Sequence, residues 1–253
     1  MNQVKIRKIV FGEGRPKICV PITGRTREEI ALRTAELKAA KPDLAEWRAD
    51  WYEEVFDGEK LEATLAWLRE ELGELPLLVT FRTREEGGEQ SVSPKDYAAF
   101  LRTVLMSGQA DLIDVELLRG EELLRDICRE AKAQGVKVIA SSHDFEKTPA
   151  KEEILARLIR MQDCGADLLK LAVMPQDAAD VLTLLSATLE MSEKYAKQPV
   201  VTMSMGAKGA VSRLAGEVFG SAMTFGSAGV ASAPGQVSVP ELKMALEVLR
   251  QGK

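Results

Sequence analysis

The sequence predicts an α/β fold, a (β/α)₈ TIM barrel, and three observations support this prediction. Short β-branched or apolar runs occur eight times along the chain, at a spacing of roughly thirty residues. A longer stretch of helical period follows each run, as the crossover between parallel strands requires. The length of 253 residues is close to the ~250 typical of a one-domain barrel. We therefore expect one domain over residues 1–253.

A hairpin is expected ahead of the barrel strands. Residues 4–15 alternate between polar and apolar side chains around a turn at Gly12–Gly14, and such a hairpin would close one end of the barrel. The alternative fold is an open doubly wound sheet, but no G-x-G-x-x-G turn follows the first strand. The eight predicted strands begin near Ile18, Leu44, Leu77, Leu112, Val136, Leu168, Val200 and Ala222.

Several helix starts can be predicted from capping residues. Thr26 and Glu29 form a T-x-x-E capping box ahead of an amphipathic run. Ser93–Pro94 and Thr148–Pro149 each place a capping hydroxyl before a proline at the first helical position. The segment 177–195 carries apolar residues every three or four positions, which indicates one buried helix face.

The charge distribution argues against two kinds of partner. The net charge is −5 and the basic residues are interspersed with acidic ones, so we expect neither nucleic acid nor a membrane surface as partner. The N-terminal segment holds no apolar stretch typical of a secretory signal, and no apolar run approaches the ~18 residues of a transmembrane helix. These features favour a cytoplasmic protein that acts on a small molecule.

The cysteines do not predict a metal site. Cys19, Cys128 and Cys164 lie in unrelated contexts, no CxxC pair occurs, and the chain has a single histidine. We expect buried free thiols, as is usual in a reducing cytoplasm.

Ionisable residues at the ends of the predicted strands indicate where the chemistry lies. Buried parallel strands have no structural reason to end in charged groups. In α/β barrels the active site lies at the C-terminal ends of the strands. The residues in question are Glu46, Arg48, Arg82, Glu116, His143, Asp144 and Lys170.

Lys170 is the most informative of these residues, because it interrupts the apolar strand LLKLAVM. It can form an internal salt bridge, for example to Glu116, or it can act as a nucleophilic amine that attacks a carbonyl. At an ordinary value of ~10.4, only about one lysine in two thousand is neutral at pH 7. A barrel interior is a suitable place to raise that fraction.

His143 is the candidate acid/base. It ends the strand before the one that holds Lys170, so the two side chains can meet. Imine formation, α-proton removal and imine hydrolysis all need a group that exchanges protons near pH 7. Glu86 follows the third strand and could fix the imidazole tautomer. Glu85 competes for that role, and either acid could instead be solvated in the loop.

The last two strands predict a binding site for an anionic group. Arg213 follows the seventh strand, and a guanidinium with nearby Ser and Gln donors suits a carboxylate or phosphate. Residues 226–236 are small, polar and rich in glycine, as a closing lid would be. Met203 and Met205 are expected to be apolar packing residues, with a bound ring as one partner they could pack against, and Phe225 is a further candidate for contact with the substrate.

Over essentially its full length the chain resembles the type I 3-dehydroquinate dehydratases of the shikimate pathway. The matching segments occur in that family's order and spacing. They are EWRAD (46–50), TFRTREEGGEQ (80–90), SSHDFEKTP (141–149), KLAVMPQ (170–176), TMSMGAKGAVSRLAGEVFGSAMTFG (202–226) and SAPGQ (232–236).

The resemblance implies a lyase of aromatic amino acid biosynthesis that dehydrates 3-dehydroquinate to 3-dehydroshikimate without metal or cofactor. It implies that Lys170 forms an imine with the ring ketone, that His143 transfers the protons, and that Glu86 orients the histidine. It also implies a homodimer. The residues that match the family's substrate contacts are Glu46, Arg48 and Arg82 for the ring hydroxyls, and Arg213, Ser232 and Gln236 for the carboxylate.

Some positions depart from the family pattern, and two other functions stay open. Pro21 stands where some members have a serine that contributes to the substrate site, and proline has no hydroxyl to offer. A barrel aldolase acting on a sugar phosphate would use the same imine but cleave a carbon–carbon bond. A barrel that binds a metabolite without turning it over would be expected to lack a catalytic group, whereas Glu86, His143 and Lys170 are all present.

Overall fold

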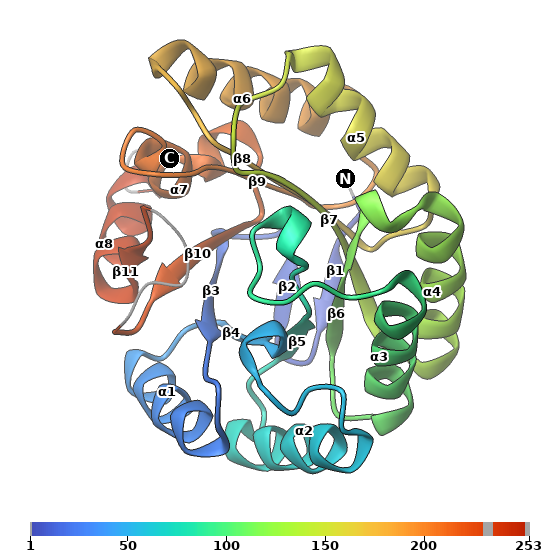
Figure 1. The fold of residues 1–253 in the computed structure, drawn as a ribbon. Helices are drawn as coiled ribbons and strands as arrows, with labels where there is room; N and C mark the ends of the chain where they lie inside the picture. The colour runs from blue at the N-terminus through green and yellow to red at the C-terminus, as the bar shows by residue number, and fades with distance from the viewer. Residues whose placement is uncertain (1, 230–234, 251–253) are drawn as a thin grey trace.

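The computed structural model describes residues 2–229 and 235–250 as a (β/α)₈ barrel with an N-terminal hairpin (Figure 1). Neighbouring barrel strands pair in parallel, and a hydrogen bond from Ala222 N to Val200 O closes the ring. The barrel strands are β3 (Lys17–Ile22), β4 (Leu44–Arg48), β5 (Leu77–Thr80), β6 (Leu112–Glu116), β7 (Lys137–Asp144), β8 (Leu168–Val173), β9 (Val200–Ser204) and β10 (Met223–Ser227), and the short β11 (Val237–Ser238) pairs with β10. The eight predicted strands are thus confirmed.

Helices form an outer ring around these strands (Figure 1). They cover the strand residues that point outward, so that the main core lies between the sheet and the helices. The helices are α1 (Arg27–Ala40), α2 (Gly58–Leu72), α3 (Pro94–Ser107), α4 (Glu121–Gln134), α5 (Lys151–Asp163), α6 (Ala178–Glu190), α7 (Ala210–Leu214) and α8 (Val239–Arg250). A π-turn over Met191–Tyr195 extends α6.

The N-terminal hairpin closes the bottom of the barrel as predicted, but its turn lies elsewhere. Strands β1 (Val4–Ile6) and β2 (Ile9–Phe11) pair across a turn at Arg7, whose φ is +49°, so the predicted turn at Gly12–Gly14 is wrong. Those glycines instead connect β2 to β3 with positive φ. Val4, Ile6 and Phe11 pack against the inward residues at the N-terminal ends of the strands.

Two of the three predicted caps are confirmed. The Thr26 hydroxyl accepts from Glu29 N, and the Ser93 hydroxyl accepts from Asp96 N ahead of Pro94. The prediction for Thr148–Pro149 is wrong, because α5 begins only at Lys151. The Thr148 hydroxyl donates instead to Met174 O at 3.1 Å, a contact with the loop after β8 that no local pattern could reveal.

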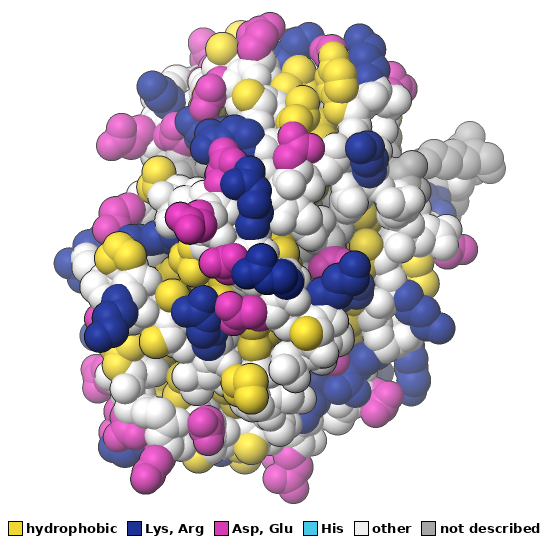
Figure 2. All heavy atoms as spheres, turned by 90° about the vertical axis from the view of Figure 1, so that its right-hand side faces the viewer, with side chains coloured by type: hydrophobic (Ala, Val, Ile, Leu, Met, Phe, Trp, Pro, Cys, Tyr) yellow, Lys and Arg dark blue, Asp and Glu magenta, His cyan; other side chains and the backbone are white. Residues whose placement is uncertain are grey.

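The outer face over α3, α4 and α5 carries both signs of charge close together (Figure 2). Arg102 pairs with Glu130 across α3 and α4, and Arg160 pairs with Glu121 across α5 and α4. These exposed pairs leave no large patch of one sign on this face. Among the described residues, none of the helices has the length and apolar character needed to span a bilayer.

Candidate active site

The barrel interior is built in layers that follow from the strand period of two. The lowest inward residues are apolar and belong to the cluster under the hairpin. Two positions further along five of these strands the inward side chains become polar: Glu46, Thr80, Asp114, Ser141 and Lys170. Two positions further again come Arg48, Arg82, Glu116 and His143. Charge is therefore confined to the C-terminal half of the interior.

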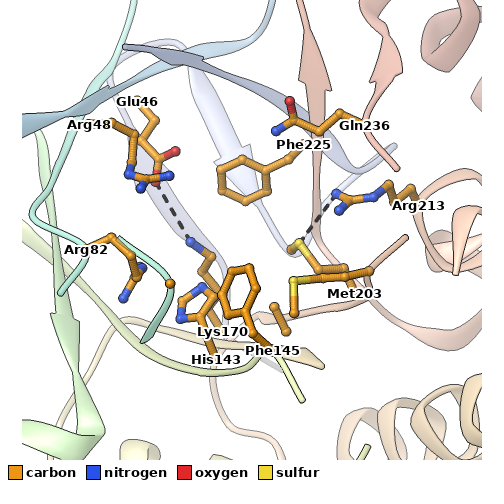
Figure 3. A pocket seen from close by; sticks show the side chains of 13 residues that line it. Glu46, Arg48, Arg82, His143, Phe145, Lys170, Met203, Arg213, Phe225 and Gln236 are labelled. Carbon is orange, nitrogen blue, oxygen red and sulfur yellow. Dashed lines mark hydrogen bonds and ion pairs between the residues drawn. The ribbon is translucent and has the colours of Figure 1, made fainter. Parts of the chain in front are cut away.

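A cavity opens at this end of the barrel. Glu46, Arg48 and Arg82 lie on one side of it, Arg213 and Gln236 lie on the other, and Lys170 lies between them (Figure 3). The lining residues are Glu46, Arg48, Arg82, Gly87, His143, Phe145, Lys170, Ala172, Met203, Met205, Arg213, Phe225 and Gln236. Most of the predicted site residues thus surround one cavity.

Lys170 has close carboxylates, but not the predicted one. Its Nζ lies 3.4 Å from Asp114 Oδ2 and 3.8 Å from Glu46 Oε1, and 4.6 Å above the centre of the Phe225 ring. The suggested salt bridge to Glu116 is absent from the ion pairs of the described residues, because that carboxylate accepts from Arg82 and Thr83. The amine nevertheless faces the cavity, where a carbonyl compound can reach it.

His143 and Glu86 form a buried pair. His143 Nδ1 lies 2.8 Å from Glu86 Oε2, and the same oxygen accepts the backbone N–H of His143 at 3.0 Å. Glu86 itself does not line the cavity, so it contacts the site only through His143 and Arg82. The competing Glu85 points to solvent and pairs with Arg119.

The electrostatics favour a neutral imidazole. Burial, with Arg82 and Lys170 nearby, lowers the pKa of His143 well below its ordinary value. Burial also raises the pKa of Glu86 to about 8, although Arg82 opposes the shift. Both directions have the same cause, since a site without water disfavours either charged form. A neutral imidazole held through Nδ1 keeps its second nitrogen for proton transfer.

Arg48 and Arg82 are held rigidly by carboxylates. Arg48 donates from Nε and Nη2 to both oxygens of Asp50, at 2.8 and 2.9 Å. Arg82 donates to Asp114 at 2.9 Å and to Glu116 at 2.8 Å, and these two partners outweigh burial and raise its pKa well above the ordinary value. Both guanidinium groups therefore stay charged and keep one orientation beside the cavity.

On the opposite side of the cavity, the buried Arg213 lies against the apolar side chain of Met203. Arg213, on α7, is 2% exposed, and its Nη1 lies 3.6 Å from Met203 Sδ. Burial lowers its pKa to about 10, so it is still a cation at neutral pH. Gln236 lies on the same side of the cavity as Arg213 (Figure 3). The predicted ligand Ser232 and residues 230–234 of the predicted lid lie outside the described residues.

Two features of the site were missed at the sequence level. Asp114 interrupts the apolar strand LIDVEL just as Lys170 interrupts its own strand, so the same rule could have found it. Phe145 packs over His143 with ring centres 6.5 Å apart and forms a cavity wall. Gly87, with φ +82°, makes room for it, since a Cβ there would overlap the Phe145 ring.

Metal ions have no evident ligand set within the described ranges, where no three His, Cys, Asp or Glu side chains are grouped to hold one. Cys19, Cys128 and Cys164 are buried and free, as expected. The arrangement instead brings together an amine, a neutral imidazole and fixed guanidinium groups. Such a set can attack a carbonyl, transfer protons and orient an anionic, hydroxylated molecule.

Comparisons with known proteins agree on one family. The model of the Type I 3-dehydroquinase family matches residues 18–253. The 3-dehydroquinate dehydratase of Syntrophotalea carbinolica is 53% identical over 249 residues, 98% of each chain. That of Bacillus licheniformis is 52% identical over 248 residues, again 98% of each. The crystal structure of the type I enzyme from Clostridium difficile with covalently modified comenic acid has a TM-score of 0.96 and 48% identity, and covers 100% of this chain and 99% of that one.

Proposed function

This chain belongs to the type I 3-dehydroquinase family of enzymes, and we propose that it dehydrates 3-dehydroquinate to 3-dehydroshikimate through an imine on Lys170. The observation that carries the proposal is the lysine amine in the cavity, with the fixed Arg48 and Arg82 on one side and Arg213 on the other. The aldolase alternative would need a phosphate site at the rim, whereas the described part of this rim offers one buried arginine beside Met203 and Gln236.

The reaction begins at the amine of Lys170. The ammonium gives up a proton, and the free amine attacks the ring ketone to give a carbinolamine. That proton returns to the carbinolamine hydroxyl, which leaves as water and gives an iminium. Apolar neighbours, including the Phe225 ring, limit the water around the nitrogen. The iminium then acts as the electron sink for removal of the adjacent proton.

His143 transfers the protons in these steps. It lies on β7, beside β8, and pairs in register with Ala172, one inward position above the lysine. As a neutral base it takes the α-proton, and the electron pair moves onto the nitrogen to give an enamine. The enamine expels the β-hydroxyl, which takes the proton back from His143 and leaves as water. A further water hydrolyses the conjugated iminium and frees Lys170.

The substrate contacts follow the two sides of the cavity. Arg213 and Gln236, together with Ser232, bind the carboxylate, and a guanidinium suits that group well. Glu46, Arg48 and Arg82 bind the ring hydroxyls. Met203, Met205 and Phe225 provide apolar surface against the ring carbons.

We also propose that the enzyme serves aromatic amino acid biosynthesis in the cytoplasm as a homodimer. Buried free thiols suit a reducing compartment. Exposed apolar side chains on the neighbouring helices α6, α7 and α8, namely Leu182, Val211 and Met244, support self-association. Sedimentation velocity tests the dimer, and rescue of a dehydroquinase-deficient strain grown without aromatic amino acids tests the pathway.

Borohydride reduction tests the imine. The protein is reduced with and without 3-dehydroquinate, and the peptides are analysed by mass spectrometry. A substrate-dependent adduct on Lys170, together with loss of activity, is the expected result. A folded protein that forms the conjugated product without any adduct would contradict the imine mechanism, and cleavage of a carbon–carbon bond would favour the aldolase.

A further inference from the structure

Asp114, on β6, lies at the centre of the barrel and has no role in the reaction as described so far. Its side chain is fully buried, and its Oδ1 accepts from the Ser141 hydroxyl at 2.6 Å. Its Oδ2 accepts from Arg82 Nη2 at 2.9 Å and lies 3.4 Å from Lys170 Nζ. One carboxylate oxygen is therefore shared by a fixed guanidinium and the reacting nitrogen.

The charge state of Asp114 is well determined by these contacts. Burial alone would raise its pKa, but Arg82 and Lys170 outweigh burial and hold the pKa below the ordinary value. Removing water also strengthens its attraction for a nearby cation. The side chain is thus a carboxylate at any working pH, at a fixed distance from the amine.

We propose that Asp114 is the counterion of the Lys170 nitrogen, and that it stabilises this nitrogen whenever it carries positive charge during the reaction. The inference rests on the proposed function, because it assumes that the nitrogen becomes an iminium. Overall, an ammonium and a ketone give an iminium and one water, so the nitrogen is positively charged both before and after imine formation. In the enamine the nitrogen is neutral. When the enamine expels the hydroxyl, positive charge returns to the nitrogen beside Asp114, which favours that step.

Other groups around the nitrogen must be weighed against Asp114. Glu46 is the one other carboxylate in an ion pair with Lys170 within the described ranges, and it lies further away, at 3.8 Å. Glu46 also accepts a hydrogen bond from the Thr80 hydroxyl, and the ion pairs of the described residues include none between Glu46 and an arginine. The titratable or charged groups that face Lys170 are Cys19 from β3, Glu46 from β4, Arg82 following β5, Asp114 from β6 and His143 from β7.

The test measures the charge on Lys170 without any substrate. The protein is labelled with trace acetic anhydride over a range of pH, and peptide mass spectrometry gives the pH at which half of the Lys170 side chains react. Asp114→Asn keeps the shape of the side chain but removes its charge, so this midpoint should fall by about one to three pH units. Glu46→Gln should move it less, and Ser141→Ala, which only loosens the carboxylate, should move it slightly in the same direction.

A second measurement addresses the iminium itself. At a pH above both midpoints, where the amine is neutral in both proteins, borohydride should trap less adduct with 3-dehydroquinate in Asp114→Asn than in the parent. An unmoved midpoint, equal trapping, or a larger midpoint shift in Glu46→Gln overturns the proposal. If Asp114→Asn does not fold, Ser141→Ala decides, since an unmoved midpoint there also overturns it. If the parent formed no adduct at all, the proposed function would be contradicted instead. The labelling result would still report the charge on Lys170, because it is measured without substrate.

Discussion

The two ends of the barrel interior are built from the same strands but have opposite character. At the N-terminal end the inward residues are apolar and pack against Phe11 of the hairpin. At the C-terminal end five of the strands turn polar within two residues, for example from Leu112 to Asp114 and from Leu168 to Lys170. One end is therefore suited to stability and the other to chemistry.

The polar end is tolerable only because its charges are paired. For example, Arg82 donates to Asp114 at 2.9 Å and to Glu116 at 2.8 Å, and both of these carboxylates are fully buried. An unpaired charge at this depth would cost several kcal/mol. Variants at the apolar end should therefore change stability and leave the chemistry, whereas variants at the polar end should change the chemistry or, where a buried group titrates, the dependence of stability on pH. Four variants test this division.

The largest effect is expected from Lys170→Ala. This change removes the nucleophile, so turnover should fall to the uncatalysed background. It also removes a buried cation from beside Asp114, but that carboxylate keeps Arg82 as a partner, so the barrel should still fold. Product formation by ultraviolet absorbance and near-ultraviolet circular dichroism check the two statements. Measurable turnover through another amine would contradict the assignment.

His143→Ala should reduce kcat by about 10²–10⁴-fold, the usual range for loss of a general acid/base. The amine remains, so an imine can still form slowly, but elimination and hydrolysis both lose their proton carrier. We therefore expect a covalent adduct to accumulate on Lys170 without added borohydride. Intact-protein mass spectrometry detects it, and turnover at the parental rate would show that another group moves the protons.

Phe11→Ala should lower the free energy of unfolding by about 3–5 kcal/mol, because the ring is fully buried under the barrel. The kcat of the folded fraction should stay unchanged. Phe56→Ala is the matched control, since that ring is 51% exposed, and its loss should cost clearly less. Urea denaturation with parallel kinetics checks both. A kcat that falls with Phe11→Ala would mean that the two ends are coupled.

Local sequence patterns predicted the parts of the fold that local interactions determine. The strand runs and the Thr26 and Ser93 caps depend on neighbours in sequence. The failures depend on contacts with distant segments. Thr148 bonds to the loop after β8, and the hairpin turn at Arg7 is held by an ion pair from its Nε to Asp111 at 2.7 Å. No pattern near either residue carries that information.

The same distinction holds for the site. Lys170 and His143 could be recognised because ionisable residues are out of place in apolar strands. The pairing of Lys170 with Asp114, and not with Glu116, could not be recognised, because these acids are two positions apart on one strand. Arg82 donates to both acids, but Glu116 also accepts two hydrogen bonds from Thr83, whereas Asp114 keeps Oδ2 beside Lys170. That is a property of the assembled barrel.

Glu86→Gln should change the free energy of unfolding by an amount that depends on pH. Burial raises the pKa of Glu86 to about 8 in the folded state, above the ~4.3 of an exposed Glu. The folded state therefore holds the proton more tightly, and the parent loses stability as the pH rises from about 4.3 to about 8. Glutamine has no proton to lose. The free energy of unfolding of the variant should therefore rise relative to that of the parent between about pH 4.3 and about pH 8, and the difference should stay constant above that. Urea denaturation at several pH values measures it.

Glu85→Gln is the matched control for this prediction. Its side chain is 50% exposed and paired with Arg119, and its pKa is lowered, chiefly by its own backbone N–H. Its stability contribution is lost only as the pH falls through that lowered value, so Glu85→Gln should track the parent from about pH 5 upward. If Glu86→Gln also tracked the parent there, the carboxyl would be ionised at neutral pH. An ionised Glu86 would stabilise an imidazolium that forms on His143 during catalysis. The polar end would then hold a further buried charge at Glu86, although burial favours the neutral acid.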